Sequence, residues 1–229
     1  MTSSVATPRD HRRRLAGESG AALLEAAVIG PVFIVVVLSI LEYGLVYRDY
    51  LTASDAVADA ARTGAVQGND MTTASQTADY SIIRAMRDSL ASLDYNTVER
   101  IVVFKAAGPD NGSPVAQTPD ACKNGSASDS ASSCNLYFPA AAFGAIQYGD
   151  DDYFECLVAG DPACGWNPAG DPPTRQNGTE EDGSGNIIPP DYLGVYVRIE
   201  HKMISGIFGS TFTIEDASIF RIEQGSLST

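Results

Sequence analysis

The chain is poor in basic residues and in histidine. Its 229 residues include 15 Lys and Arg against 29 Asp and Glu, which leaves a formal net charge of −14. A surface of this sign repels phosphate groups, so we expect neither nucleic acid nor an anionic lipid surface as a partner. The only two histidines, His11 and His201, are far apart in sequence. A catalytic or metal centre built on them is therefore not expected.

Motifs that mark enzymes are also missing. There is no P-loop, no nucleophile elbow and no pair of carboxylates that spacing alone singles out. The sequence DGSGN at 182–186 departs from a calcium loop, because Ile187 stands where that loop needs glycine. The acidic run 150–152 is expected to be a solvated turn. Three Asn-Gly-Ser/Thr sequences are expected to form turns, since Asn-Gly favours them: Asn111, Asn124 and Asn177. We expect no catalytic residue, no cofactor and no metal.

The longest apolar run, residues 21–41, contains one charged residue, Glu25. At about 1.5 Å per residue, a helix of this length crosses a bilayer of about 30 Å. A carboxylate inside such a run costs about 2.5–3.5 kcal/mol on insertion scales, so it is expected to have a function. Residues 9–14 before the run are rich in arginine. Short basic flanks stay in the cytoplasm, so the rest of the chain is expected on the outer side of the membrane.

Three kinds of segment compete for this N-terminus. A signal peptide has a shorter apolar core of about 7–15 residues and a small-residue cleavage site after it, which does not fit here. An uncleaved anchor fits the length but gives Glu25 no role. A prepilin-type leader, cut between Gly20 and Ala21 on the cytoplasmic side, makes Glu25 the fifth residue of the mature chain. Glycine followed by alanine supplies the unhindered bond that such a cut needs.

The sequence from Gly20 to Glu25 (GAALLE), Pro31 and the sequence LEYG at 41–44 resemble the start of TadE-like proteins. These are minor pseudopilins of tight-adherence (Flp-type) pili. Residues 192–202 and 220–223 are similar to late strands of that family, so the resemblance covers roughly residues 12–66 and 192–223. Prepilin motifs usually have an aromatic residue after the glutamate, where this chain has Ala26.

The resemblance implies a protein of the cytoplasmic (inner) membrane with a single span, its N-terminus in the cytoplasm and its C-terminal domain outside. The implied partners are other pilin or pseudopilin subunits, prepilin peptidase and the pilus assembly platform in the membrane. In pilin-like assemblies the carboxylate corresponding to Glu25 pairs with a neighbour's N-terminal amine, which offsets the cost of burying both charges. The alternative for Glu25 alone is that it lies near the headgroups and extends to water.

A second function class stays open. The chain fits an uncleaved, membrane-tethered extracellular binding or adhesion protein, whose loop from Cys122 to Cys164 recognises a ligand. On that interpretation the arginine-rich residues 9–14 remain on the chain, and replacing Glu25 has little effect.

Four cysteines follow the apolar run: Cys122, Cys134, Cys156 and Cys164. Their expected location outside the membrane favours disulfides. Eleven and seven residues separate the consecutive pairs, which does not suit the C-x₂₋₄-C spacing of zinc sites. Of the three possible connectivities we prefer Cys122–Cys134 with Cys156–Cys164, because both pairs close short local loops that they would stabilise.

The apolar run is expected to continue as a helix to about residue 65, with Pro31 bending it rather than ending it. Residues 45–65 are rich in alanine. One helical face is expected to be apolar: Val46, Tyr50, Ala53, Val57 and Ala61.

A second helix is expected at 73–93. Its three- and four-residue spacing marks a core-facing stripe: Tyr80, Ile83, Met86, Leu90 and Leu93. A strand is expected at 98–106, buried on both faces. Residues 108–190 are rich in Gly, Pro, Ser and Asp and are expected to form long loops, with a short helical turn at 139–149 and a flexible part at 168–190.

Two strands are expected at the C-terminus, 194–202 and 210–222. Alternation in the first predicts a sheet with one solvated face. The apolar connection 203–208 is expected in the core of the domain, with the membrane or a partner subunit as the alternative.

These patterns predict an α+β fold in which a long N-terminal transmembrane helix continues into a pilin-like head with a small antiparallel sheet and disulfide-braced loops. The expected organisation is a basic leader (1–20), a transmembrane helix (21–41), a helical stalk with the second helix and first strand (42–107), a cysteine-containing loop region (108–191) and the C-terminal strands (192–229).

Overall fold

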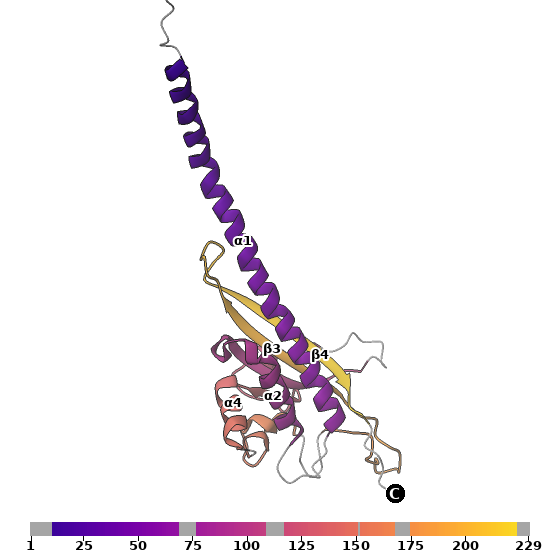
Figure 1. The fold of residues 1–229 in the computed structure, drawn as a ribbon. Helices are drawn as coiled ribbons and strands as arrows, with labels where there is room; N and C mark the ends of the chain where they lie inside the picture. Colours follow the sequence, from indigo (N-terminus) through magenta and orange to yellow (C-terminus); the bar gives the residue numbers. More distant parts are fainter. Residues whose placement is uncertain (1–10, 69–76, 109–116, 151, 168–174, 224–229) are drawn as a thin grey trace, which may run out of the picture. The chain divides into compact units, whose positions relative to one another are not determined.

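The computed structural model describes residues 11–68, 77–108, 117–150, 152–167 and 175–223, with only the main chain for residues 11–19 and Tyr95. The chain forms two units, Met1–Leu45 and Val46–Thr229. We call the second unit the head. One helix, α1 (His11–Gln67), contributes to both (Figure 1).

α1 continues through Pro31, so the proline does not end the helix. Pro31 has no N–H for the carbonyl of Ala27, four residues earlier. The bend expected at this position stays a prediction. Within the described residues α1 is the one helix long and apolar enough to cross a membrane; its most apolar window has a mean hydropathy of 2.6 and is not buried at all. This N-terminal apolar helix suggests a membrane anchor.

The head contains a four-stranded antiparallel sheet in the order β2-β1-β3-β4. The strands are β1 (Val98–Ala106), β2 (Cys134–Tyr137), β3 (Tyr192–Lys202) and β4 (Thr211–Arg221). β3 and β4 form a long hairpin in which Tyr192 pairs with Arg221 and Lys202 with Thr211 (Figure 1). The expected α+β class with a small antiparallel sheet is confirmed.

The part of α1 that belongs to the head, from Val46 onward, shares one core with a face of this sheet. Its small residues are fully buried: Ala53, Ala56, Ala60 and Ala61. At Gly64 a β-carbon would lie 2.6 Å from the Ile82 side chain and 3.1 Å from that of Leu193, so the helix backbone itself is in contact there. The expected apolar face is correct except at Tyr50, which is 43% exposed.

β3 runs antiparallel to α1. Leu193, near the start of β3, lies beside Gly64, and His201, near its end, pairs with Asp49 at 2.6 Å. The loop between β3 and β4 is therefore at the end of the head where α1 enters it.

Helices cover the same core. α2 (Ala78–Ser89) begins at Thr77, whose side-chain oxygen accepts a hydrogen bond from the N–H of Tyr80. The 3₁₀ turn η1 (Leu90–Ser92) extends it, so the structure bears out the second helix over the described part of 73–93; residues 73–76 lie outside that part. All five residues of the expected stripe are buried. α4 (Pro139–Tyr148) is longer than the short turn expected for this stretch.

The opposite face of the sheet is covered as well. Val102, Phe104 and Tyr196 form a second buried cluster with Cys122, Cys134 and Leu136. The short helix α3 (Asp120–Lys123) carries Cys122 over this face. The expectation of a solvated face is therefore wrong at Tyr196, which is 3% exposed, whereas burial of β1 on both faces is confirmed.

The cysteines pair locally. Cys122 bonds to Cys134 and Cys156 to Cys164, with Cα atoms 6.3 and 4.7 Å apart. The first bond fixes α3 to β2, and the second closes a loop that contains the 3₁₀ turn η5 (Pro162–Cys164). Three-residue 3₁₀ turns also occur at η2 (Tyr95–Thr97) and η4 (Asp152–Phe154).

Two expectations need correction. In the stretch expected to be flexible, Arg175 is completely buried and the N–H of Asp191 donates to the carbonyl of Gln176. Residues 168–174 lie outside the described part, and the flexibility of the exposed residues 181–187 stays a prediction. The connection 203–208 is not in the core of the head. Ile204 in it is 77% exposed, and Ile207 and Phe208 are about half exposed. Only its first residue, Met203, packs against the core.

Gly194 in β3 offers a test of the packing between the sheet and its second cluster. A β-carbon at this position would lie 2.3 Å from the ring of Phe104. We expect Gly194→Ala to lower the free energy of unfolding by about 1–3 kcal/mol, as overpacking does. Urea unfolding of the full-length protein in detergent measures it.

Gly144→Ala is the matched control, because Gly144 lies within α4 with nothing within 4 Å of its β-carbon position. Alanine there should raise stability by about 0.5–1 kcal/mol, the usual helix preference. Equal effects of the two substitutions would contradict the close contact of Gly194 with Phe104.

Candidate functional site

The apolar run of the N-terminal unit, residues 21–41, presents a helix surface with one carboxylate, Glu25. The described side chains from Gly20 to Ile29 are all exposed, including Ala21 and Glu25. Around Glu25 the helix surface forms a shallow groove lined by Ala22, Glu25, Ala26, Ile29, Gly30 and Phe33. These positions recur at three- and four-residue intervals, so they lie on one face.

Three small residues shape this face. Ala22, Ala26 and Gly30 follow one another at four-residue spacing. In lipid, small residues at this spacing let two helices approach closely. Glu25 lies beside them, so a helix packed into the groove contacts the carboxylate. The other polar side chain of the run, Ser39, is satisfied within the helix, because its hydroxyl donates to the carbonyl of Val35 at 2.6 Å.

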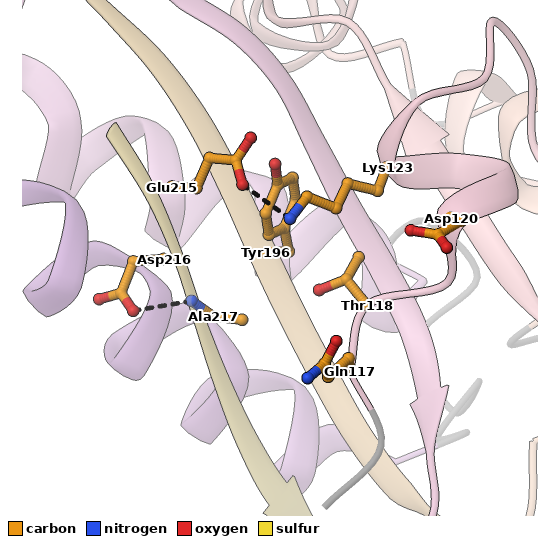
Figure 2. Close-up of a pocket in the computed structure, with 8 residues that line it drawn as sticks. All are labelled: Gln117, Thr118, Asp120, Lys123, Tyr196, Glu215, Asp216 and Ala217. Atoms are coloured by element: carbon orange, nitrogen blue, oxygen red, sulfur yellow. Dashed lines mark hydrogen bonds and ion pairs between the residues drawn. The ribbon is translucent and has the colours of Figure 1, made fainter. Parts of the chain in front are cut away.

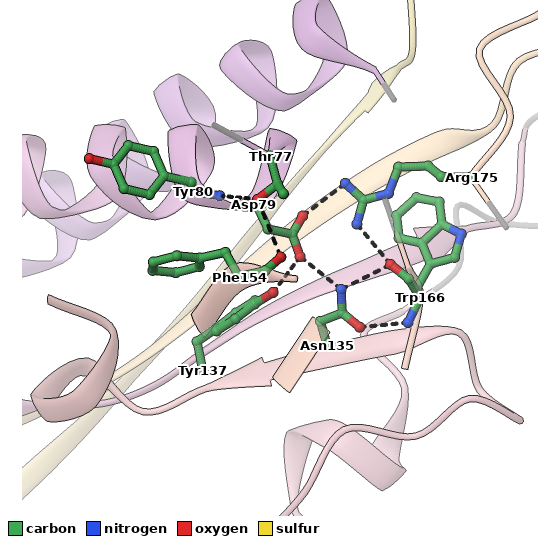
Figure 3. Close-up of polar contacts among 8 residues, drawn as sticks. All are labelled: Thr77, Asp79, Tyr80, Asn135, Tyr137, Phe154, Trp166 and Arg175. Carbon is green, nitrogen blue, oxygen red and sulfur yellow. Dashed lines mark hydrogen bonds and ion pairs between the residues drawn. The ribbon is translucent and has the colours of Figure 1, made fainter. Parts of the chain in front are cut away.

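The head contains a buried polar cluster centred on Asp79 (Figure 3). Asp79 and Arg175 are both inaccessible to solvent and form an ion pair of 2.8 Å. The other carboxylate oxygen of Asp79 accepts hydrogen bonds from the Tyr137 hydroxyl at 2.6 Å and the Asn135 side-chain amide at 2.7 Å. The cluster thus joins α2 and β2 to the segment around Arg175.

Trp166 completes the cluster. Its carbonyl accepts hydrogen bonds from Asn135 at 2.9 Å and from Arg175 at 3.1 Å. The guanidinium of Arg175 also lies over the indole ring, 4.2 Å from the centroid, which is a favourable cation–π position. Burial, and then the negative charge of Asp79, raise the pKa of Tyr137 well above its usual range, so this phenol stays protonated and donates.

Because Asp79 and Arg175 are completely inaccessible, a substrate cannot reach them, and we assign the cluster to stability. Sequence reasoning missed it. Asp79 is in the first turn of α2, where an acidic residue is common on electrostatic grounds alone. Arg175 falls in a polar stretch that carries no pattern of burial. The one residue in the sequence that could have pointed to a buried cluster in this region was Trp166, the single tryptophan of the chain.

His201 is not isolated, contrary to what the sequence suggests. Its Nδ1 lies 2.6 Å from a carboxylate oxygen of Asp49, and both residues are largely buried. The other oxygen of Asp49 accepts two hydrogen bonds from Arg48. The contact between His201 and Asp49 joins the end of β3 to α1. Among the described residues no three His, Cys, Asp or Glu side chains are grouped so that they could hold a metal ion.

A polar pocket lies over β3 and β4, beside α3 (Figure 2). Its one basic residue, Lys123, is paired with one of its three acidic residues. Lys123 contacts Glu215 at 2.7 Å and lies 5.5 Å from the centroid of the Tyr196 ring. The hydrogen bond from Lys123 holds the pKa of Glu215 below its usual value, while burial and the charge of Glu215 raise the pKa of Tyr196. Because Lys123 is already paired with Glu215, the pocket gives an anionic ligand little to recognise.

Two of the three expected Asn-Gly turns, at Asn124 and Asn177, lie in the described residues, and Asp182 forms a further turn that was not expected. Asp182 accepts hydrogen bonds from the N–H groups of Ser184 and Asn186, which lower the pKa of its carboxyl group. Asn177 accepts from the N–H of Thr179, and Asn124 ends α3. Asn111 and Asp151 lie outside the described residues.

A family model for TadE-like proteins matches residues 20–62, which confirms the resemblance over this segment. No curated protein and no solved structure matches the chain. The match begins at Gly20 and includes Ala21, Glu25 and Pro31. TadE-like proteins are structural proteins associated with the tight-adherence pilus and are not known as enzymes, so the match indicates a pilus-associated protein. The similarity expected at 192–223 lies outside the matched segment.

The cluster predicts a large effect of Asp79→Asn. This change leaves the Arg175 charge buried without its counter-ion, and breaking a buried pair typically costs about 3–5 kcal/mol. Urea unfolding of the full-length protein in detergent, followed by the emission of buried Trp166, measures the loss.

The control is Asp88→Asn on the exposed side of the same helix, which should change stability by less than about 0.5 kcal/mol. The double variant Asp79→Asn, Arg175→Met should recover part of the loss, because no unpaired charge remains. An unfolding midpoint of Asp79→Asn equal to that of Asp88→Asn would show that the ion pair does not stabilise the head.

Proposed function

We propose that this chain is a minor pseudopilin that supports assembly of a tight-adherence (Flp-type) pilus. Prepilin peptidase cuts it between Gly20 and Ala21, and the mature chain packs against other pilin or pseudopilin subunits through its N-terminal helix. The observation that carries the proposal is the exposed, small-residue face of α1, which holds one carboxylate five residues after the cut.

Charge supports a role for Glu25 in subunit contact. Cleavage leaves a new amino group on Ala21, at the edge of the apolar run. A neighbouring subunit shifted along the helix axis can bring its amino group to Glu25, and each charge then offsets the cost of burying the other. Because the pairing requires one particular shift, it also sets the register between the two helices. Close helix contact at Ala22, Ala26 and Gly30 brings the two groups together.

The topology of the chain fits this role. The arginines of residues 9–14 keep the leader in the cytoplasm, where the peptidase cuts before the apolar run. The head then lies outside the cytoplasmic membrane, where disulfides such as Cys122–Cys134 and Cys156–Cys164 form and persist. The assembly platform in the membrane is the remaining partner of the mature chain.

The first prediction is the mature N-terminus. Intact mass of the protein extracted from its native membrane should correspond to a chain that begins at Ala21. Gly20→Val, which crowds the scissile bond, should leave the arginine-rich leader attached.

Gly44→Val is the control, because Gly44 is also an exposed glycine of α1 with nothing near its β-carbon position but lies far from the cut. It should be processed normally. A wild-type chain that retains Arg12, Arg13 and Arg14 would overturn the proposed processing and favour the tethered binding protein.

The second prediction concerns Glu25 after processing. Glu25→Gln keeps the shape of the side chain and removes its charge, so the chain should still insert into the membrane and be cut. In cells that produce the variant as their only copy, the number of surface pili should fall by at least about tenfold. A tenfold fall corresponds to a loss of about 1.4 kcal/mol in the free energy of subunit association.

Ser39→Ala, a polar change in the same run that removes a hydrogen bond within one helix, should leave piliation unchanged. Normal piliation with Glu25→Gln would argue against pairing with a neighbour's amino group, even if cleavage occurs after Gly20.

A further inference from the structure

The loop between β3 and β4 presents apolar side chains to solvent in an ordered turn. We define the hairpin tip as residues 203–212. Of the large apolar residues in it, Met203 packs against the core of the head. The others are exposed: Ile204 (77%), Ile207 (47%), Phe208 (48%) and Phe212 (47%). The turn is well formed: the N–H of Met203 donates to the carbonyl of Ser210, and Gly206 and Gly209 have positive φ angles of 66° and 116°. The ordered turn therefore leaves these four side chains about half exposed or more.

The hairpin tip carries no charged side chain. From Met203 to Ile214 there is no charged residue, in a chain whose net charge is −14. The residue next to it, Lys202, is basic and exposed. A long cationic side chain beside an apolar segment is typical of a membrane interface, where the chain lies along the acyl region and the ammonium group reaches the headgroups.

The position of the tip in the head is set by contacts within the head. Since Leu193 lies beside Gly64 and His201 pairs with Asp49, β3 points toward the end where α1 enters. Asp49 is eight residues after Leu41, the last residue of the apolar run. Eight residues span about 12 Å as a helix and at most about 28 Å when extended, however the two units are oriented. The membrane surface is thus within reach of this end of the head.

We infer that the hairpin tip inserts into the lipid interface at the membrane surface from which α1 emerges, giving the head a second attachment to the bilayer. A second copy of the chain is a less suitable occupant. Stable protein interfaces bury about 800 Å² on each partner, and the tip offers only a few side chains and no pairable charge besides Lys202. Lipid binding needs neither a large area nor complementary charge. The inference depends on membrane anchoring and not on pilus assembly.

The test uses the full-length protein in vesicles of zwitterionic phosphatidylcholine, part of which is brominated near the top of the acyl chains. Ile207→Trp adds an indole at the tip. Ile187→Trp is the matched control, because Ile187 is also exposed (57%) but precedes the opposite end of β3. β3 has eleven residues, so the two ends are about 33 Å apart. The wild-type protein supplies the background of Trp166, which is buried.

We expect the indole at position 207 to be quenched in proportion to the brominated fraction, and the indole at position 187 to be insensitive to it. Equal quenching at both positions, or none at 207, would overturn the inference. Emission at 207 that is shifted to the blue but depends on the protein-to-lipid ratio rather than on bromine would assign the tip to a second copy of the chain, which also overturns it.

Discussion

The close approach of α1 to the sheet is the constraint on which the rest of the head depends. Alanines and Gly64 allow the helix backbone to approach the sheet, and the larger side chains of β3, such as Leu193 and Val197, fill the space between them. The same helix continues from the apolar run that carries Glu25. A substitution on this face of α1 therefore affects the packing of the head through the same helix that contains the apolar run.

Features that depend on local patterns could be predicted from the sequence. The apolar run, the stripe of α2 and the burial of β1 could all be predicted, because each shows as a pattern of apolar residues within one short stretch of sequence. The cysteine pairing belongs here too, since Cys122–Cys134 and Cys156–Cys164 close short loops. For the candidate site, Glu25 stood out as one charge in an apolar segment, but the groove that contains Ala22 and Gly30 became apparent only on the helix surface.

Features that depend on distant contacts could not be predicted. Asp79 and Arg175 are 96 residues apart, and nothing near Arg175 distinguishes it from a solvated arginine. Its guanidinium is buried against Asp79 and Trp166, the first distant from it in sequence and the second outside its own segment of regular pattern. Alternation along β3 predicts that Tyr196 is exposed to solvent. It cannot reveal that α3, distant in sequence, covers that face of the sheet. In the same way, the apolar character of Ile204 could not distinguish the core from a hairpin that extends past it.

The antiparallel arrangement of α1 and β3 has a mechanical consequence. Tension applied along α1 slides the helix lengthwise across the sheet, so the contacts from Asp49–His201 at one end to Gly64–Leu193 at the other resist the load together. Resistance to force is governed by the barrier to unfolding rather than by equilibrium stability. Contacts loaded together in shear resist a larger force than the contacts of a hairpin pulled at one end, which break one pair at a time.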